Sequence, residues 1–218
     1  MKIRSKLVDL NALRFIVGDS AHLNTSNDIA VKSITLAKDS LGNVPLTSPP
    51  TARILSVTVG RRADLSAGVA FNDVIRGRYA GLRAEFLVAD DPSADYARME
   101  RAADSADITI VSSYVGQAWN ATSAAAPHAF TSFIDHLASP GRKLIVISFG
   151  NPYLLQEISA VPAYVVAWGG SQGSQIAAAR ALLGTSPITG RLPISIPLDD
   201  GARKIPRGTG IMRPGSAK

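Results

Sequence analysis

The sequence predicts an α/β fold, a three-layer sandwich in which a mainly parallel sheet of about six strands carries helices on both faces. Short segments rich in β-branched residues alternate along the chain with helical patterns, and this alternation is typical of parallel sheets. Several of these segments are apolar at consecutive positions, as expected for strands buried on both faces. Hydrophobic residues fill 46% of the 218 positions, which is enough for a sizeable core.

The expected elements follow one another in a regular order. Apolar segments of five to seven residues predict strands, and segments with apolar residues at helical spacing predict helices. The predicted strands are Arg53–Val59, Ala84–Ala89, Ile108–Ser113, Lys143–Phe149, Tyr164–Trp168 and Leu192–Ile196. The predicted helices are Asp28–Lys38, Ala67–Arg78, Ala94–Ser105, Ala129–Leu137 and Ser174–Leu183.

Proline and glycine mark the boundaries between several of these elements. Pro45, Pro49 and Pro50 lie in an extended connection between the first helix and the first strand. Pro140 and Gly141 form a turn before the most apolar strand. Gly184 follows the last helix, where a left-handed C-cap favours glycine.

The basic charge of the chain is concentrated at its two ends. The net charge is +6, but residues 7–202 contain 15 basic and 17 acidic residues, a net of −2. A nucleic-acid-binding domain usually concentrates basic residues on one folded face. We therefore expect solvated ends and no nucleic-acid partner.

The sequence has no cysteine, and so no disulfide framework or thiolate chemistry. No apolar run follows the basic residues near Met1, and we expect neither a signal peptide nor a membrane span. No cluster has the spacing of a zinc or calcium site, and no cofactor is expected. The sequence does not identify the compartment: the parent protein is expected to be periplasmic or secreted, or otherwise cytoplasmic.

A G-x-S-x-G pattern, Gly169-Gly170-Ser171-Gln172-Gly173, lies between a predicted strand and a predicted helix. This is the context of the nucleophile in α/β-hydrolases, so a serine hydrolase using Ser171 is one alternative function. That chemistry requires a histidine base, and all three histidines precede Ser171 in the sequence.

The same loop supports a second alternative, a stand-alone module that binds a nucleotide or a phosphosugar. Backbone N–H groups at the start of a helix favour anions. The loop lacks the Lys-Ser/Thr ending of a Walker loop and the complete G-x-G-x-x-G pattern.

An ordered series of short motifs in the last third resembles the C-terminal α/β sandwich domain of glycoside hydrolase family 3. The motifs are Ser148-Phe149-Gly150-Asn151-Pro152-Tyr153-Leu154-Leu155, Val161-Pro162-Ala163-Tyr164, Ala181-Leu182-Leu183-Gly184 and the segment from Gly190 to Pro197. Val17-Gly18, the segment Ile29–Asp39 and Val44-Pro45-Leu46 are similar to the linker, first helix and following turn of that family. The resemblance covers roughly Phe15 to Pro197.

The resemblance implies a domain organisation. Residues 1–27 would be a linker from a missing upstream domain, residues 28–198 the α/β domain, and residues 199–218 a flexible basic tail. In this family the catalytic aspartate lies in an N-terminal (β/α)8 barrel, which needs about 250 residues. No part of this chain is long enough to be that barrel. The partners implied are that barrel, a carbohydrate substrate at the domain junction, and a second copy in a homo-oligomer.

The resemblance also implies that this chain contains no catalytic residue. In the β-glucosidase branch, a loop of this domain supplies an acid/base glutamate. The comparable loop here, Tyr114 to Ser123, contains neither Glu nor Asp. This departure fits better the β-N-acetylglucosaminidase branch, in which a His-Asp dyad on a barrel loop supplies the proton. Glu85, Glu100 and Glu157 do not resemble half of a catalytic pair.

Polar and aromatic residues near the ends of two predicted strands are the candidates for a substrate rim or a domain interface. Ligands of open α/β sheets gather at the carboxyl ends of the strands. An aromatic ring with nearby amides suits the faces and hydroxyl groups of sugars, and a tryptophan in a long loop also packs well against a partner domain. The candidates are Tyr114, Gln117, Trp119, Asn120 and Asn151.

Overall fold

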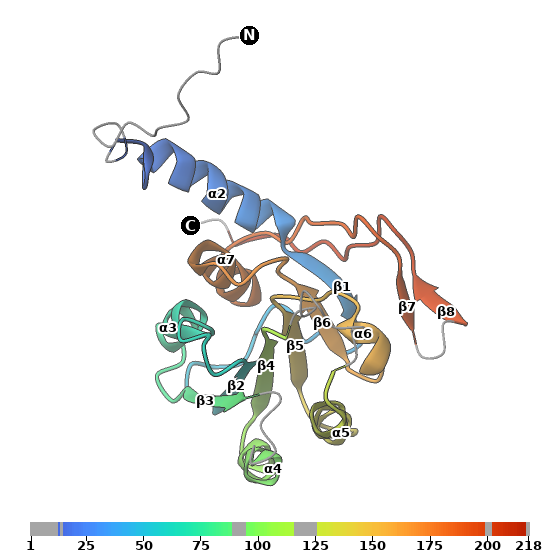
Figure 1. Cartoon of the computed structure of the whole chain (residues 1–218). Helices are drawn as coiled ribbons and strands as arrows, with labels where there is room; N and C mark the ends of the chain where they lie inside the picture. Colours follow the sequence, from blue (N-terminus) through green and yellow to red (C-terminus); the bar gives the residue numbers. More distant parts are fainter. Residues whose placement is uncertain (1–12, 14, 89–94, 116–125, 199–201, 217–218) are drawn as a thin grey trace.

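The computed structural model describes residues 13, 15–88, 95–115, 126–198 and 202–216. Its centre is a six-stranded sheet with the strand order β1-β6-β5-β4-β2-β3 (Figure 1). All neighbouring strands are parallel except β1 and β6. The strands are β1 Thr35–Asp39, β2 Ile54–Gly60, β3 Arg83–Val88, β4 Ile108–Ser113, β5 Leu144–Ser148 and β6 Ala163–Val166. The predicted fold class is confirmed.

Helices cover both faces of this sheet (Figure 1). Helices α3 and α7 pack over one face, with the C-terminal end of α2 against α7, and α4, α5 and α6 pack over the other face. The helices are α2 Ser20–Ser33, α3 Val69–Arg76, α4 Tyr96–Asp104, α5 His128–Leu137, α6 Leu154–Glu157 and α7 Gln172–Leu182. None of the helices that the structure describes is long and apolar enough to span a membrane.

Two apolar cores form because successive strand residues point to opposite faces. In β4, Ile110 packs in the core beneath α3 and α7 with Phe71, while Val111 packs in the core beneath α4 and α5 with Phe133. All residues of β2, β4, β5 and β6 are buried. This burial explains why consecutive apolar residues predict these strands correctly.

The first predicted helix, Asp28–Lys38, is wrong at both ends. Helix α2 begins at Ser20, where the carboxylate of Asp19 accepts hydrogen bonds from the first turn. It ends at Ser33, and residues 35–39 form β1, paired antiparallel with β6. The segment 35–39 contains good helix formers, and tertiary pairing overrides that propensity.

The sixth strand of the sheet is therefore β1, and the predicted strand Leu192–Ile196 is wrong. The strand in this region is β7 Ile196–Leu198, which pairs antiparallel with β8 Arg203–Ile205 outside the main sheet. Pro193 lies in the predicted segment, and a proline cannot donate to a strand ladder.

The described part of the predicted tail packs against the domain. The guanidinium of Arg213 donates to the buried carboxylate of Asp39 at 2.9 Å and to the carbonyl of Val44 at 2.8 Å. The backbones of Ile188 and Arg213 exchange hydrogen bonds of 2.9 and 3.1 Å. Low hydrophobicity predicts a flexible segment here, but long-range polar contacts hold residues 202–216 in place.

Candidate functional site

The order of the strands locates the region where a ligand is expected to bind. The chain passes from β2 to β3 on one side, then crosses back to β4 on the other side of β2. Such a reversal opens a crevice at the carboxyl ends of β2 and β4. Ligands of open α/β sheets bind in crevices of this kind.

A cavity of about 460 Å³ lies at this point, and we call it the carboxyl-edge pocket. Segments that follow four parallel strands, β2, β4, β5 and β6, contribute to its lining. The lining residues are Arg61, Ala63, Asp64, Leu65, Ser66, Ala67, Tyr114, Phe149 and Gly170. Its volume lies within the usual range for small-molecule sites.

The loop after β2 folds back on itself through one ion pair. The carboxylate of Asp64 accepts from the guanidinium of Arg61 at 3.0 and 3.2 Å and from the Arg61 backbone N–H at 3.2 Å. The Arg61 guanidinium, hydrogen-bonded to this carboxylate, lowers the pKa of Asp64. Asp64 is thus ionised at neutral pH and has no proton to donate.

Tyr114 connects this loop to the ends of β4 and β5. Its ring stacks on Phe149, with centroids 4.6 Å apart, and its hydroxyl oxygen accepts from the N–H of Gly68 at 3.0 Å. A Cβ on Gly170 would lie 3.1 Å from the ring of Tyr114, so this ring is packed against the turn after β6. Burial raises the pKa of the Tyr114 phenol. The ring of Tyr114 thus forms part of the pocket wall, and Phe149 covers one face of this ring.

Gln175, on α7, connects the walls of the pocket from beneath. Its amide nitrogen donates to the carbonyl oxygens of Ser66 and Gly170, both at 3.0 Å. Its amide oxygen accepts from the N–H of Phe71 at 3.4 Å.

The turn after β6 contains a strained residue. Trp168 has a φ of +62°, a left-handed conformation that is unfavourable for bulky side chains. Its indole N–H donates to the hydroxyl of Thr35 at 3.2 Å. This hydrogen bond stabilises the sharp turn that brings Gly170 to the pocket.

Asn151 lies at the same edge but uses most of its polar groups internally. Its carbonyl accepts from the hydroxyl of Ser148 at 2.8 Å, and its side-chain oxygen accepts from the N–H of Tyr153 at 3.0 Å. Its N–H donates to the carbonyl of Val115 at 3.4 Å. Asn151 thus builds the turn after β5 and does not line the pocket.

The remaining predicted candidates, Gln117, Trp119 and Asn120, lie outside the described residues. The described part of the same loop, Tyr114 and Val115, ends at the carboxyl edge of β4.

Ser171 is engaged as the N-cap of α7. Its hydroxyl accepts from the N–H of Ser174 at 3.2 Å and lies 3.0 Å from the Ser174 hydroxyl. His128 and His136 lie on α5, which covers the opposite face of the sheet. The sheet lies between these two histidines and α7, and the third histidine, His22, lies on α2. The cap of Ser171 already uses one helix N–H that an anion would need.

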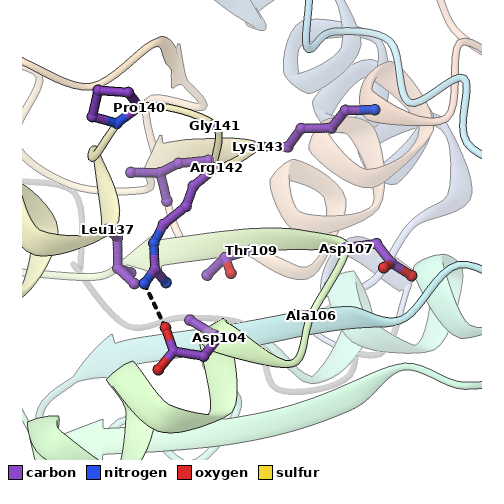
Figure 2. Close-up of a pocket in the computed structure, with 11 residues that line it drawn as sticks. Asp104, Ala106, Asp107, Thr109, Leu137, Pro140, Gly141, Arg142 and Lys143 are labelled. Carbon is purple, nitrogen blue, oxygen red and sulfur yellow. Dashed lines mark hydrogen bonds and ion pairs between the residues drawn. The ribbon is translucent and has the colours of Figure 1, made fainter.

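A second cavity, of about 330 Å³, lies at the amino ends of β4 and β5 (Figure 2). Figure 2 shows Arg142 reaching across it to form an ion pair with Asp104, while Thr109 lies on its floor. Asp107, at its rim, pairs with Arg53. Both carboxylates of its lining are therefore paired with arginines, and the cavity lies at the edge of the sheet opposite to the switch point.

No group of three or more metal-ligating side chains occurs among the described residues. The carboxyl-edge pocket contains one carboxylate, Asp64, among its described lining residues, and this group is already paired. The arrangement is suited to binding a polar ligand or a partner surface at its mouth.

The chain folds as a doubly covered α/β domain, and strand-end loops build the edge that holds the carboxyl-edge pocket. A family model described as the glycosyl hydrolase family 3 C-terminal domain matches residues 13–210. The chain belongs to this family, as its motifs predicted. A search of curated proteins finds no match.

Solved structures of family 3 enzymes share the fold. A fungal multi-domain β-N-acetylglucosaminidase is 21% identical with a TM-score of 0.69, covering 90% of this chain and 21% of that one. A β-N-acetylglucosaminidase from Paenibacillus sp. str. FPU-7 is 17% identical with a TM-score of 0.66, covering 91% of this chain and 35% of that one. A β-glucosidase from Listeria innocua, in complex with glucose, is 18% identical with a TM-score of 0.67, covering 86% and 28%. The chain therefore spans about a third or less of the length of these enzymes.

Several residues of the site were missed by the sequence-based prediction, chiefly Arg61, Asp64 and Gln175. One signal was available for the first two, because polar residues directly follow the buried strand that ends at Gly60. Gln175 is a polar residue inside a helix of small residues, and periodicity alone does not reveal its partners.

Proposed function

We propose that this chain is the non-nucleophilic domain of a family 3 glycoside hydrolase whose parent enzyme removes terminal β-linked sugars. The domain packs on the (β/α)8 barrel and shapes the rim of the active site with its carboxyl-edge pocket. The observation that carries the proposal is this pocket, placed at the switch point of a chain that belongs to the family.

The carboxylates of Asp64, Glu85 and Glu157 support a role without acid/base catalysis. A general acid must be protonated near the working pH, and the pKa of Asp64 is lowered by Arg61. Burial raises the pKa of Glu85, but its bonds to Arg83 and Arg98 outweigh this effect and lower it. The carboxylate of Glu157 accepts from the N–H of Ala126 at 2.8 Å.

For the parent enzyme we propose N-acetyl-β-glucosaminides as substrates. The loop that follows β4 contains no Glu or Asp between Tyr114 and Ser123, so this domain lacks the acid/base glutamate of the β-glucosidase branch. The absence of this glutamate is compatible with an enzyme in which the barrel provides both the nucleophile and the acid/base group. Two of the structures that share this fold are described as β-N-acetylglucosaminidases.

Sequencing the DNA upstream of the codon for Met1 tests the domain assignment. We expect an in-phase reading frame that encodes a barrel of about 250 residues or more. An in-phase stop codon just upstream, with no barrel gene nearby, would contradict the proposed assembly.

Kinetics on two chromogenic substrates test the chemistry. The assembled enzyme is expected to hydrolyse 4-nitrophenyl N-acetyl-β-glucosaminide with a higher kcat/KM than 4-nitrophenyl β-glucoside, and the chain alone should hydrolyse neither. A reversed preference would exclude the proposed substrate. Hydrolysis by the isolated chain would exclude the non-catalytic role. Covalent labelling by a fluorophosphonate that is lost in Ser171→Ala would point to serine chemistry.

A further inference from the structure

Gln175 is an uncharged polar side chain buried in the core of the domain. It is 1% exposed, on a helix whose other buried residues are mostly alanines. Burying an amide is unfavourable unless its donors and acceptor are used. Gln175 uses both of its donor positions and its acceptor, and the partners of these bonds suggest why glutamine occupies this site.

The two carbonyls that Gln175 binds belong to different walls of the carboxyl-edge pocket. Ser66 lies in the loop after β2, and Gly170 lies in the turn after β6. The carbonyl of Ser66 also accepts from Val69 N–H, at a longer distance of 3.3 Å. The third bond, from Phe71, fixes the start of α3 relative to α7. One side chain therefore links two walls that are far apart in the sequence.

The geometry points to Gln175 as a positioning residue that sets the separation of the two pocket walls, and thereby the fit of the sugar bound at the rim. The effect on the sugar rests on the proposed function, whereas the effect on the walls does not. A glutamate at this position would present acceptors to two carbonyl oxygens, and an asparagine is one methylene shorter. Glutamine alone among uncharged side chains of this length offers two donors and an acceptor.

Hydrogen exchange on the full chain tests the positioning of the walls. Gln175→Met keeps the approximate length of the side chain but removes its hydrogen bonds. The matched control is Asn43→Leu, because the amide of Asn43 also donates to a backbone carbonyl, that of Leu144, at the opposite edge of the sheet. We expect the amides of Ala67, Gly68 and Phe71 to exchange about tenfold faster in Gln175→Met than in the wild type.

In Asn43→Leu these three amides should keep their wild-type exchange rates. Unchanged exchange at all three in Gln175→Met would overturn the inference. Equal acceleration throughout β4 and β5 would also overturn it, since Gln175 would then stabilise the core in general.

Steady-state kinetics of the enzyme assembled with its barrel test the consequence for the substrate. A wider pocket weakens substrate and transition state alike, so Gln175→Met should raise KM about tenfold and leave kcat within about twofold. Asn43→Leu should change neither constant. A fall in kcat at constant KM would contradict positioning of the walls. If the wild-type assembly is inactive, the proposed function fails, while the exchange rates still decide the role of Gln175.

Discussion

The rings of Tyr114 and Phe149 stack with their centroids 4.6 Å apart and their planes 7° from parallel. Tyr114 follows β4 and Phe149 follows β5, so this stack joins the ends of two neighbouring strands. The hydroxyl of Tyr114 also accepts from Gly68 N–H in the loop after β2. One side chain thus fixes three loops of the carboxyl-edge pocket.

Truncating Tyr114 in two steps should separate its hydroxyl from its ring. Tyr114→Phe removes the bond from Gly68 and should lower the free energy of unfolding by about 1 kcal/mol. Tyr114→Ala also removes the stack on Phe149 and should cost about 3 kcal/mol. Urea denaturation measures both, and equal losses would show that the ring contributes nothing.

Gly68 and Gly141 both have left-handed backbones but differ in the space around them. Gly68 has a φ of +76°, and a Cβ there would lie 2.2 Å from the hydroxyl oxygen of Thr58. Gly141 has a φ of +88° and no atom within 4 Å of such a Cβ. Gly141→Ala should cost about 1 kcal/mol of stability, and Gly68→Ala should cost about 3 kcal/mol because the clash adds to the strain. Thermal unfolding of both variants should rank them in this order, and similar losses would argue against the clash.

Arg213 should stabilise the domain although it lies near the C-terminus. The side chain of Asp39 is fully buried, and Arg213→Ala would leave its carboxylate without its ionic partner. Breaking a buried pair from one side costs about 3–5 kcal/mol. The control is Arg76→Ala, which breaks an exposed pair with Asp73 and should cost no more than about 0.5 kcal/mol. If urea denaturation finds equal losses, the C-terminal segment does not stabilise the fold through Arg213.

The ion pair of Arg53 and Asp107 should appear in the acid titration of the protein. The Arg53 guanidinium, hydrogen-bonded to Asp107, lowers the pKa of that carboxyl to about 2. Because the folded pKa is depressed, the stabilisation is present above the ordinary value of 3.8 and is lost as the pH falls through about 2. Carboxyl NMR should show this pKa returning toward 3.8 in Arg53→Met. An unchanged pKa in that variant would assign the shift to another cause.

Leu65 should contribute to docking and not to the stability of the isolated domain. It is 87% exposed at the mouth of the carboxyl-edge pocket, on a loop held by Asp64 and Tyr114. Leu65→Ser should leave unfolding unchanged within about 0.5 kcal/mol. It should weaken association with the proposed barrel about tenfold, since a buried leucine contributes roughly 1.5 kcal/mol or more.

Leu41, which is 65% exposed, lines a small cavity with Lys143 at the start of β5 and provides the control. Leu41→Ser should not affect association measured by calorimetry with the separately prepared barrel. Equal effects of the two variants would mean that the docking surface is not confined to the carboxyl edge.

The central strands could be predicted from the sequence because burial on both faces demands consecutive apolar residues, as in Ile108–Ser113. Strand β1 could not, since residues 35–39 contain helix formers and become a strand through pairing with β6. The C-terminal segment escaped prediction for a related reason. It is held by long-range contacts such as the ion pair between Arg213 and Asp39, which are distant in sequence and carry no local pattern.

The sequence by itself determined the fold class and the family, because these follow from local patterns and ordered motifs. Only the tertiary structure decided which polar groups at that edge are already used. Ser171 caps α7, Asn151 builds its own turn, and Gln175 joins two pocket walls. Hydrogen bonds depend on distances of about 3 Å between groups brought together by folding, and no spacing along the chain encodes those distances directly.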